Sequence, residues 1–123
     1  MPDDRIVDGV DQLDFFTGKT EKSAREGFPV YNGPNLFGYK WRNFKLHLAH
    51  QDRMLGMVKR GVVFKIYHLL RDPKERYDLV ENDVSGGAWV APPIFKRIVA
   101  FQKTLVEEPP IPIGTPDPWD PKN

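Results

Sequence analysis

Short apolar runs that alternate with polar positions occupy the middle of the chain. Phe44, Leu46 and Leu48 alternate with Lys45, His47 and Ala49, which is the period of two expected of a strand with one buried face. An aromatic run over residues 36–40 precedes this strand, and the turn cluster at residues 32–35 (Asn-Gly-Pro-Asn) comes before that. Residues 28–48 therefore predict a strand, a turn and further strand.

A third apolar run, over residues 62–69, alternates less cleanly, as strands buried on both faces do. The connecting residues 51–61 are polar and contain two glycines, so we expect a loop there. With the runs before it, this segment predicts a small antiparallel sheet of about four strands.

Helix signals follow the last predicted strand. Residues 72–75 (Asp-Pro-Lys-Glu) predict the start of a short helical turn. The Asp can cap it, the Pro suits its first position, and the Glu completes a capping box. Residues 85–87 (Ser-Gly-Gly) are expected to be flexible. Residues 91–93 (Ala-Pro-Pro) open a second helix, whose apolar face is formed at spacings of four, three and four by Ile94, Ile98, Phe101 and Leu105.

These elements favour the α+β class: a small antiparallel sheet with a C-terminal helix packed on it, because the sheet is the large apolar surface available to that helix. Residues 1–27 are expected to form an extended linker or docking segment without regular structure, and residues 28–107 the folded α+β subdomain. Residues 108–123 are expected to be an extended, proline-rich tail, since six of the twelve prolines lie in the last fifteen residues.

The amino-acid composition indicates a single globular domain with an uneven distribution of charge. The chain has 123 residues, 40% of them apolar and 12% aromatic, which is enough for one globular domain with a core. Its 18 basic and 17 acidic residues give a net charge of +1. Residues 38–76 nevertheless hold ten basic and three acidic side chains, a local charge of +7, so the remainder carries −6. We expect any anionic ligand to approach this basic stretch.

Several chemistries are excluded or unsupported by the sequence. The chain has no cysteine, so it has no disulfide, thiolate zinc site or cysteine nucleophile, and neither Ser23 nor Ser85 lies in a nucleophile elbow. His47 and His50 would point to opposite faces of a strand, which disfavours chelation. We therefore expect no catalytic, cofactor-binding or metal-binding residue here. No signal peptide or membrane-spanning segment is evident either, and the sequence leaves the cellular location open.

Basic residues interleaved with Tyr39, Trp41, Phe44 and Tyr67 are typical of a sheet that binds single-stranded nucleic acid. An ordinary solvated sheet face has the same composition. The near-neutral total charge and the acidic flanks disfavour nucleic acid as the partner.

Three segments together resemble bacterial arylsulfatases. Residues 4–12 (DRIVDGVDQ), with 15–18 and 23–26, resemble the stretch that joins the catalytic domain of that family to its C-terminal subdomain. Residues 37–47 (FGYKWRNFKLH) look like the family's hairpin. Residues 66–79 (IYHLLRDPKERYDL) are similar to its closing signature, a Tyr-x-Leu strand followed by Asp-Pro-x-Glu and Asn-Leu.

The resemblance implies a subdomain made of a four-stranded antiparallel sheet with a helix packed on it. In the family this subdomain packs on the catalytic domain and contributes to the rim of the substrate cleft. The family's nucleophile motif, C/S-x-P-x-R, is absent, and calcium belongs to the catalytic domain that this chain lacks. The leading hypothesis is thus a C-terminal subdomain or fragment of an arylsulfatase-like sulfuric ester hydrolase, inactive on its own. Its expected partners are the catalytic domain or, through the apolar patch left exposed, a second copy of the chain.

Lys40, Arg42 and His47 are the candidate residues for the substrate rim, where they would attract anionic esters; the alternative is that they only keep the sheet soluble. The second functional hypothesis is a stand-alone binding module without enzymatic activity. In that case the sheet face around Tyr39 and Trp41 would recognise a carbohydrate or single-stranded nucleic acid.

Overall fold

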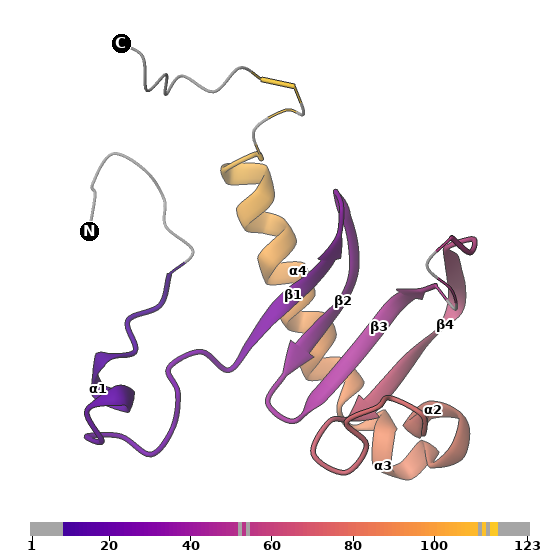
Figure 1. The fold of residues 1–123 in the computed structure, drawn as a ribbon, viewed down its shortest axis with the longest axis horizontal. Helices are drawn as coiled ribbons and strands as arrows, with labels where there is room; N and C mark the ends of the chain where they lie inside the picture. The colour runs from indigo at the N-terminus through magenta and orange to yellow at the C-terminus, as the bar shows by residue number, and fades with distance from the viewer. Residues whose placement is uncertain (1–8, 52, 54, 111, 113, 116–123) are drawn as a thin grey trace.

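A computed structural model describes residues 9–51, 53, 55–110, 112 and 114–115 of the chain. Its four strands form one antiparallel sheet in the order of the sequence (Figure 1). They are β1 (Gly27–Asn32), β2 (Asn35–Trp41), β3 (Phe44–His50) and β4 (Lys59–His68). The predicted sheet is therefore confirmed.

Both tight turns of the sheet use backbone with positive φ. Gly33, in the turn between β1 and β2, has φ 55°, which glycine adopts without steric cost. Arg42 has φ 51° in the turn between β2 and β3, where Trp41 pairs with Phe44. Such values suit two-residue hairpin turns, whose twist matches that of the flanking strands.

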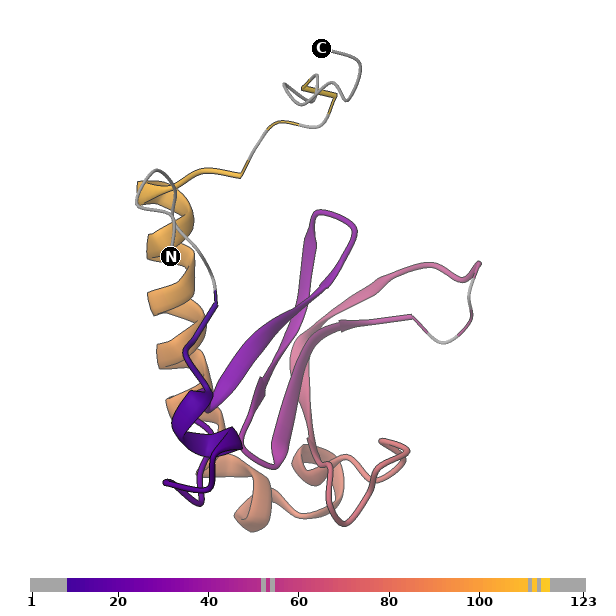
Figure 2. The same cartoon turned by 60° about the vertical axis from the view of Figure 1, so that its left-hand side comes forward.

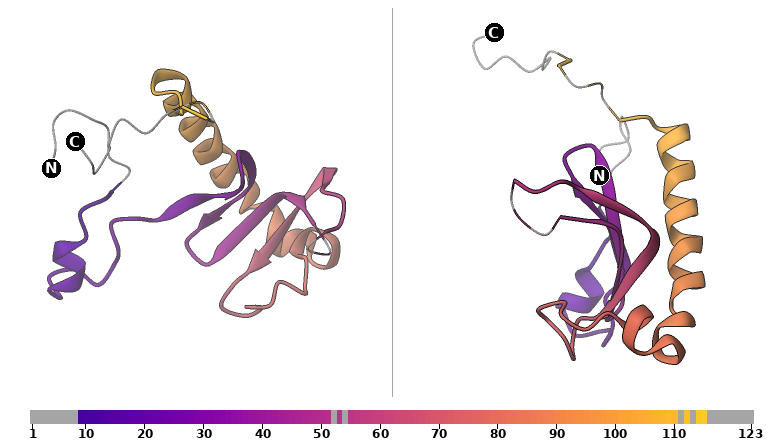
Figure 3. Two further views of the ribbon diagram at one scale, coloured as in Figure 1. Left: turned by 45° about the horizontal axis from the view of Figure 1, so that its top comes forward. Right: turned by 90° about the vertical axis from the view of Figure 1, so that its right-hand side faces the viewer.

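The helices are α1 (Leu13–Phe16), α2 (Leu79–Asn82), α3 (Val84–Ala88) and α4 (Ala91–Glu107). The long helix α4 lies along one face of the sheet (Figures 2 and 3). The predicted C-terminal helix is confirmed, and with the sheet it establishes the α+β class.

The core lies between α4 and the sheet. Ile94 and Ile98 of α4 are buried there, and Phe101, one turn further on, packs edge-on against Tyr31 of β1 at 6.2 Å between ring centroids. Burial of apolar side chains is the main free energy that holds the two layers together. The buried core residues are Trp41, Leu46, Ile66, Val90, Ala91, Ile94 and Ile98.

Asp78 links the edge strand β4 to helix α2 through hydrogen bonds of its side chain. Its side chain is buried, and Oδ1 accepts hydrogen bonds from the amide of Ile66 in the edge strand β4 (3.1 Å) and from the amide of Val80 in the first turn of α2 (3.0 Å). One carboxylate thus satisfies a backbone donor of the strand and caps a helix.

The helix predicted at residues 72–75 is wrong. Glu75 has φ 54°, in the left-handed region, and its amide donates to the carbonyl of Asp72 (3.1 Å), so these residues form a turn. The Glu75 side chain does not complete a capping box, because it reaches instead to Lys45 and His47 on the sheet. The helix begins at Leu79.

The expected flexibility of residues 85–87 is also wrong, since they lie in α3. Asp83 caps this helix by accepting from the amide of Gly86 (2.9 Å). A Cβ at Gly87 would lie 2.9 Å from the Cβ of Leu79, which is too close for real atoms. Glycine is required here because α2 and α3 approach closely, not because the chain is loose.

We expected the N-terminal segment to have no regular structure. Its described residues contradict this in part, because they include a short helix. Leu13–Phe16 form α1, and the side chain of Gln12 folds the segment back by accepting from Ser23 Oγ (3.0 Å) and the Ala24 amide (3.2 Å). Residues 1–8 and most of the proline-rich tail lie outside the described residues. The boundaries proposed for the three parts of the chain stay a prediction.

Candidate functional site

Arg42, one of the three candidate rim residues, forms an ion pair with Glu26 of the same chain. Its Nη2 lies 2.9 Å from Oε1 of Glu26, while Arg97 of α4 reaches Oε2 of the same carboxylate at 2.7 Å. Both guanidinium groups also lie over the Trp41 ring, at 4.8 and 4.7 Å from its centroid. These contacts, with Arg42 first, lower the pKa of Glu26 to about 2. The cluster ties α4 to the end of the sheet.

His47 lies on the open face of the sheet in a second cluster. Its Nε2 is 2.7 Å from Oε2 of Glu75, whose other oxygen pairs with Lys45 Nζ at 2.8 Å, and its ring packs edge-on against Tyr67 at 5.3 Å. The Nε2 contact is close but poorly aligned for a hydrogen bond. Burial and the nearby Lys45 lower the pKa of His47, although Glu75 acts in the opposite direction. The imidazole is therefore protonated less readily than that of a free histidine.

Lys40, the third candidate, shares a surface hollow with Arg42. Its Nζ lies 5.7 Å from the centroid of the Phe28 ring. The hollow has a volume of about 460 Å³ and is lined by Lys22, Ser23, Arg25, Glu26, Lys40, Arg42 and Asn43. The structure thus brings two of the three candidates together, with His47 outside the hollow. That they attract anions stays a prediction.

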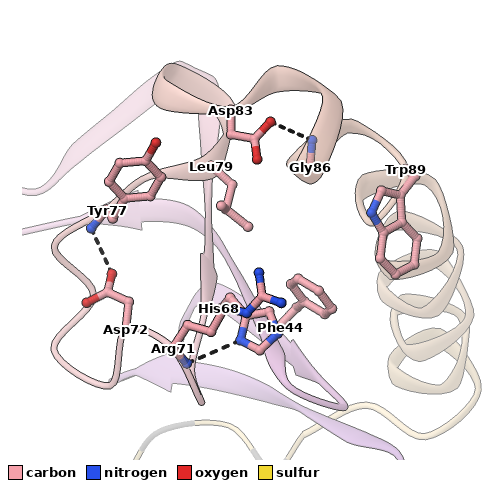
Figure 4. Close-up of a pocket in the computed structure, with 9 residues that line it drawn as sticks. All are labelled: Phe44, His68, Arg71, Asp72, Tyr77, Leu79, Asp83, Gly86 and Trp89. Atoms are coloured by element: carbon pink, nitrogen blue, oxygen red, sulfur yellow. Dashed lines mark hydrogen bonds between the residues drawn. The ribbon is translucent and has the colours of Figure 1, made fainter.

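A cavity that the sequence did not indicate lies where the sheet, the turn after β4 and the helices α2 to α4 meet (Figure 4). Its volume is about 470 Å³. Nine residues line it: Phe44, His68, Arg71, Asp72, Tyr77, Leu79, Asp83, Gly86 and Trp89. Four of these are aromatic or imidazole rings and three are charged, so the cavity can offer both ring faces and hydrogen-bonding groups to a ligand.

The cavity is built by local interactions. The Phe44 ring contacts His68 (4.7 Å between centroids) and Trp89 (5.5 Å), both edge-on. Asp72 holds the turn by accepting from the Tyr77 amide (2.7 Å). Its residues come from five separate segments, and no spacing in the sequence marks them as neighbours.

The face proposed for a stand-alone binding module is not available. Trp41 is only 6% exposed, and it lies in the core that faces α4, with Tyr39 packed against it. The sheet face that carries Tyr39 and Trp41 is thus the one that the helix covers. Any carbohydrate or nucleic acid must therefore be bound elsewhere.

The described ranges hold neither a cluster of metal ligands nor a helix that could span a membrane. No three His, Cys, Asp or Glu side chains of these residues gather closely enough to hold a metal ion. Within the same part of the chain, no helix combines the length and apolar character that crossing a bilayer demands.

The N-terminal segment carries an exposed apolar surface. Four large apolar side chains are exposed there within seven residues, and Phe15 and Phe16 border a hollow that Phe28 and Lys40 of the sheet also line (Figure 1 shows α1 beside the start of β1). The four exposed side chains are those of Val10, Leu13, Phe15 and Phe16, the last of these 80% exposed. An exposed apolar cluster of this kind marks a contact surface.

Comparison with solved structures finds a sulfatase. The chain superposes on the crystal structure of the PsFucS1 sulfatase from Pseudoalteromonas sp. with a TM-score of 0.72 and 21% sequence identity. The match covers 87% of this chain and only 22% of the sulfatase chain. No protein-family model matches the sequence, and no curated protein matches it. The likeness shows that this fold occurs as one part of a much larger sulfatase.

Proposed function

We propose that this chain is the C-terminal subdomain of an arylsulfatase-like sulfuric ester hydrolase and packs on the catalytic domain of that enzyme. The observation that carries the proposal is the structural match: nearly all of the chain corresponds to about a fifth of a sulfatase. The resemblance of residues 4–12, 37–47 and 66–79 to sulfatase sequences supports it independently.

The exposed apolar side chains of the N-terminal segment support the packing. Phe15 and Phe16 contact each other, at 5.8 Å between centroids, and the segment is folded on itself through Gln12. In the proposed enzyme this is the stretch that leads out of the catalytic domain, so its apolar side chains would be covered by that domain.

Sulfate ester hydrolysis would reside outside this chain. No cysteine is present, and neither Ser23 nor Ser85 begins the C/S-x-P-x-R motif. By the resemblance to the family, calcium would likewise be held by the catalytic domain and not by this chain. The chain would instead help to shape the rim of the cleft, with Lys40 and Arg42 of the basic hollow facing anionic esters.

The proposal predicts that the isolated chain self-associates and binds a hydrophobic dye, because its docking surface lacks its partner. Replacing Phe15 and Phe16 by Ser removes the largest exposed rings of that surface. We expect this double variant to be monomeric at concentrations where the wild-type chain is not, and to lose most of the dye signal. Sedimentation velocity and dye fluorescence measure the two effects.

A matched control replaces two exposed valines of α4, Val99 and Val106, by Ser. These lie on the helix, away from the N-terminal segment, and should leave association unchanged. A wild-type chain that is monomeric and does not bind the dye would count against a docking surface. So would association that survives the loss of both phenylalanines.

A further inference from the structure

We infer that the aromatic cavity between the turn after β4 and the start of α4 is a binding site for a sugar, with a pyranose ring held against Trp89 or Tyr77. This goes beyond the proposed function and does not depend on it, because it rests on the chemistry of the cavity alone. One face of a pyranose is formed by C–H bonds and is apolar, while hydroxyl groups surround its edge. A site for it needs an aromatic ring face together with charged or amide groups beside that ring.

The aromatic part of the requirement is met by two rings that the fold leaves exposed. Trp89 is 57% and Tyr77 is 51% exposed, although both line a cavity. They lie on opposite sides of it, with Leu79 between them in the view of Figure 4. Large rings held open at the mouth of a cavity are costly to leave in water, and they suit a ligand with an apolar face.

The polar part is met by three charged side chains. Among the described residues the guanidinium of Arg71 has no partner, so its donors are available to a ligand. Asp72 uses Oδ2 to accept from the Tyr77 amide, and Asp83 uses Oδ1 to accept from Gly86 and Ser85. Each carboxylate keeps a second oxygen, and the bonds to Gly86 and Ser85 keep the pKa of Asp83 below its usual value, so it stays an acceptor.

The same residues argue against a phosphate backbone or a simple anion as the ligand. The carboxylates of Asp72 and Asp83 outnumber the one guanidinium, of Arg71, in the lining. A polyanion would be repelled by this balance, whereas alternating donors and acceptors match the hydroxyl groups of a sugar, each of which donates and accepts.

The test is a titration of the full chain followed by two-dimensional amide NMR. The probes are the methyl glycosides of glucose, galactose, mannose and xylose, the monosulfates of glucose and galactose, inorganic sulfate, and a single-stranded oligonucleotide. We expect at least one neutral glycoside to shift the amide and indole signals of Trp89 and the signals of Tyr77 at millimolar concentration. Inorganic sulfate separates binding of the anion from binding of the sugar.

Variants assign the site. Trp89→Ala should weaken sugar binding about tenfold, since it removes a stacking surface, and Arg71→Ala should weaken it by about as much. Arg76→Ala, in the same turn but outside the cavity, is the matched control and should bind as the wild-type chain does. If Trp89→Ala disturbs the fold, Tyr77→Ala replaces it, and the amide spectrum reports which variants are folded.

Several results would overturn the inference: no response to any glycoside, a response to sulfate, sugar sulfates or oligonucleotide alone, or sugar binding that Trp89→Ala, Tyr77→Ala and Arg71→Ala all leave intact. None of these bears on self-association through Phe15 and Phe16. The two proposals can therefore fail separately.

Discussion

Replacing Leu46 by Ala is expected to cost about 2–5 kcal/mol of folding free energy, the range for a fully buried leucine. Leu46 is completely buried on β3, where its Cα pairs with Tyr39 on one side and Ile66 on the other, and it packs in the core beneath α4. Because small domains are stable by only about 5–15 kcal/mol, this one change removes much of the total.

Thermal or urea unfolding measures the effect, and a fall of more than about 10 °C in Tm is expected for a domain of this size. Leu70→Ala is the control, since Leu70 is 73% exposed in the turn after β4 and its loss should matter by no more than about 0.5 kcal/mol. Equal stability of the two variants would contradict the core described here.

Asp78→Ala is expected to destabilise the domain by about 2–4 kcal/mol. The substitution removes the cap of α2, worth about 1 kcal/mol, and leaves the buried amide of Ile66 without an acceptor, which costs about 1–3 kcal/mol more. Asp78→Asn keeps a side-chain oxygen in the same place, so it should recover more than half of the loss. Urea unfolding of both variants measures the difference.

Asp83→Ala provides the comparison for Asp78. Asp83 also caps a short helix, but its bond to the Gly86 amide is exposed and it supports no strand. Its loss should cost about 1 kcal/mol. If Asp78→Ala were no worse than Asp83→Ala, the hydrogen bond to the edge strand would contribute nothing.

Where the sequence predicted the fold correctly, the signal was periodic. Alternation around Leu46 and the spacing of Ile94 and Ile98 each depend on one element, so the sheet and α4 were predicted from local pattern. The helix expected at residues 72–75 failed for a tertiary reason. Glu75 forms an ion pair with Lys45 and contacts His47 across the sheet, and these contacts between distant residues outweigh the local capping pattern.

The candidate site was less accessible to sequence reasoning. Basic residues at 40 and 42 were found from local charge, and the structure does place them beside one hollow. Arg42 pairs with Glu26 and His47 contacts Glu75, both far along the chain, so no local pattern reveals these contacts. The aromatic cavity has the same origin: Phe44 and Trp89 meet only after folding.

The central claim, that this chain is part of a sulfatase, is tested most directly by the nucleotide sequence upstream of the Met1 codon. The account predicts that the reading frame continues without a stop and encodes the C/S-x-P-x-R nucleophile motif within a catalytic domain. A stop codon directly upstream, with no such motif in frame, would contradict it, and the chain would then be a protein that carries the fold without the chemistry.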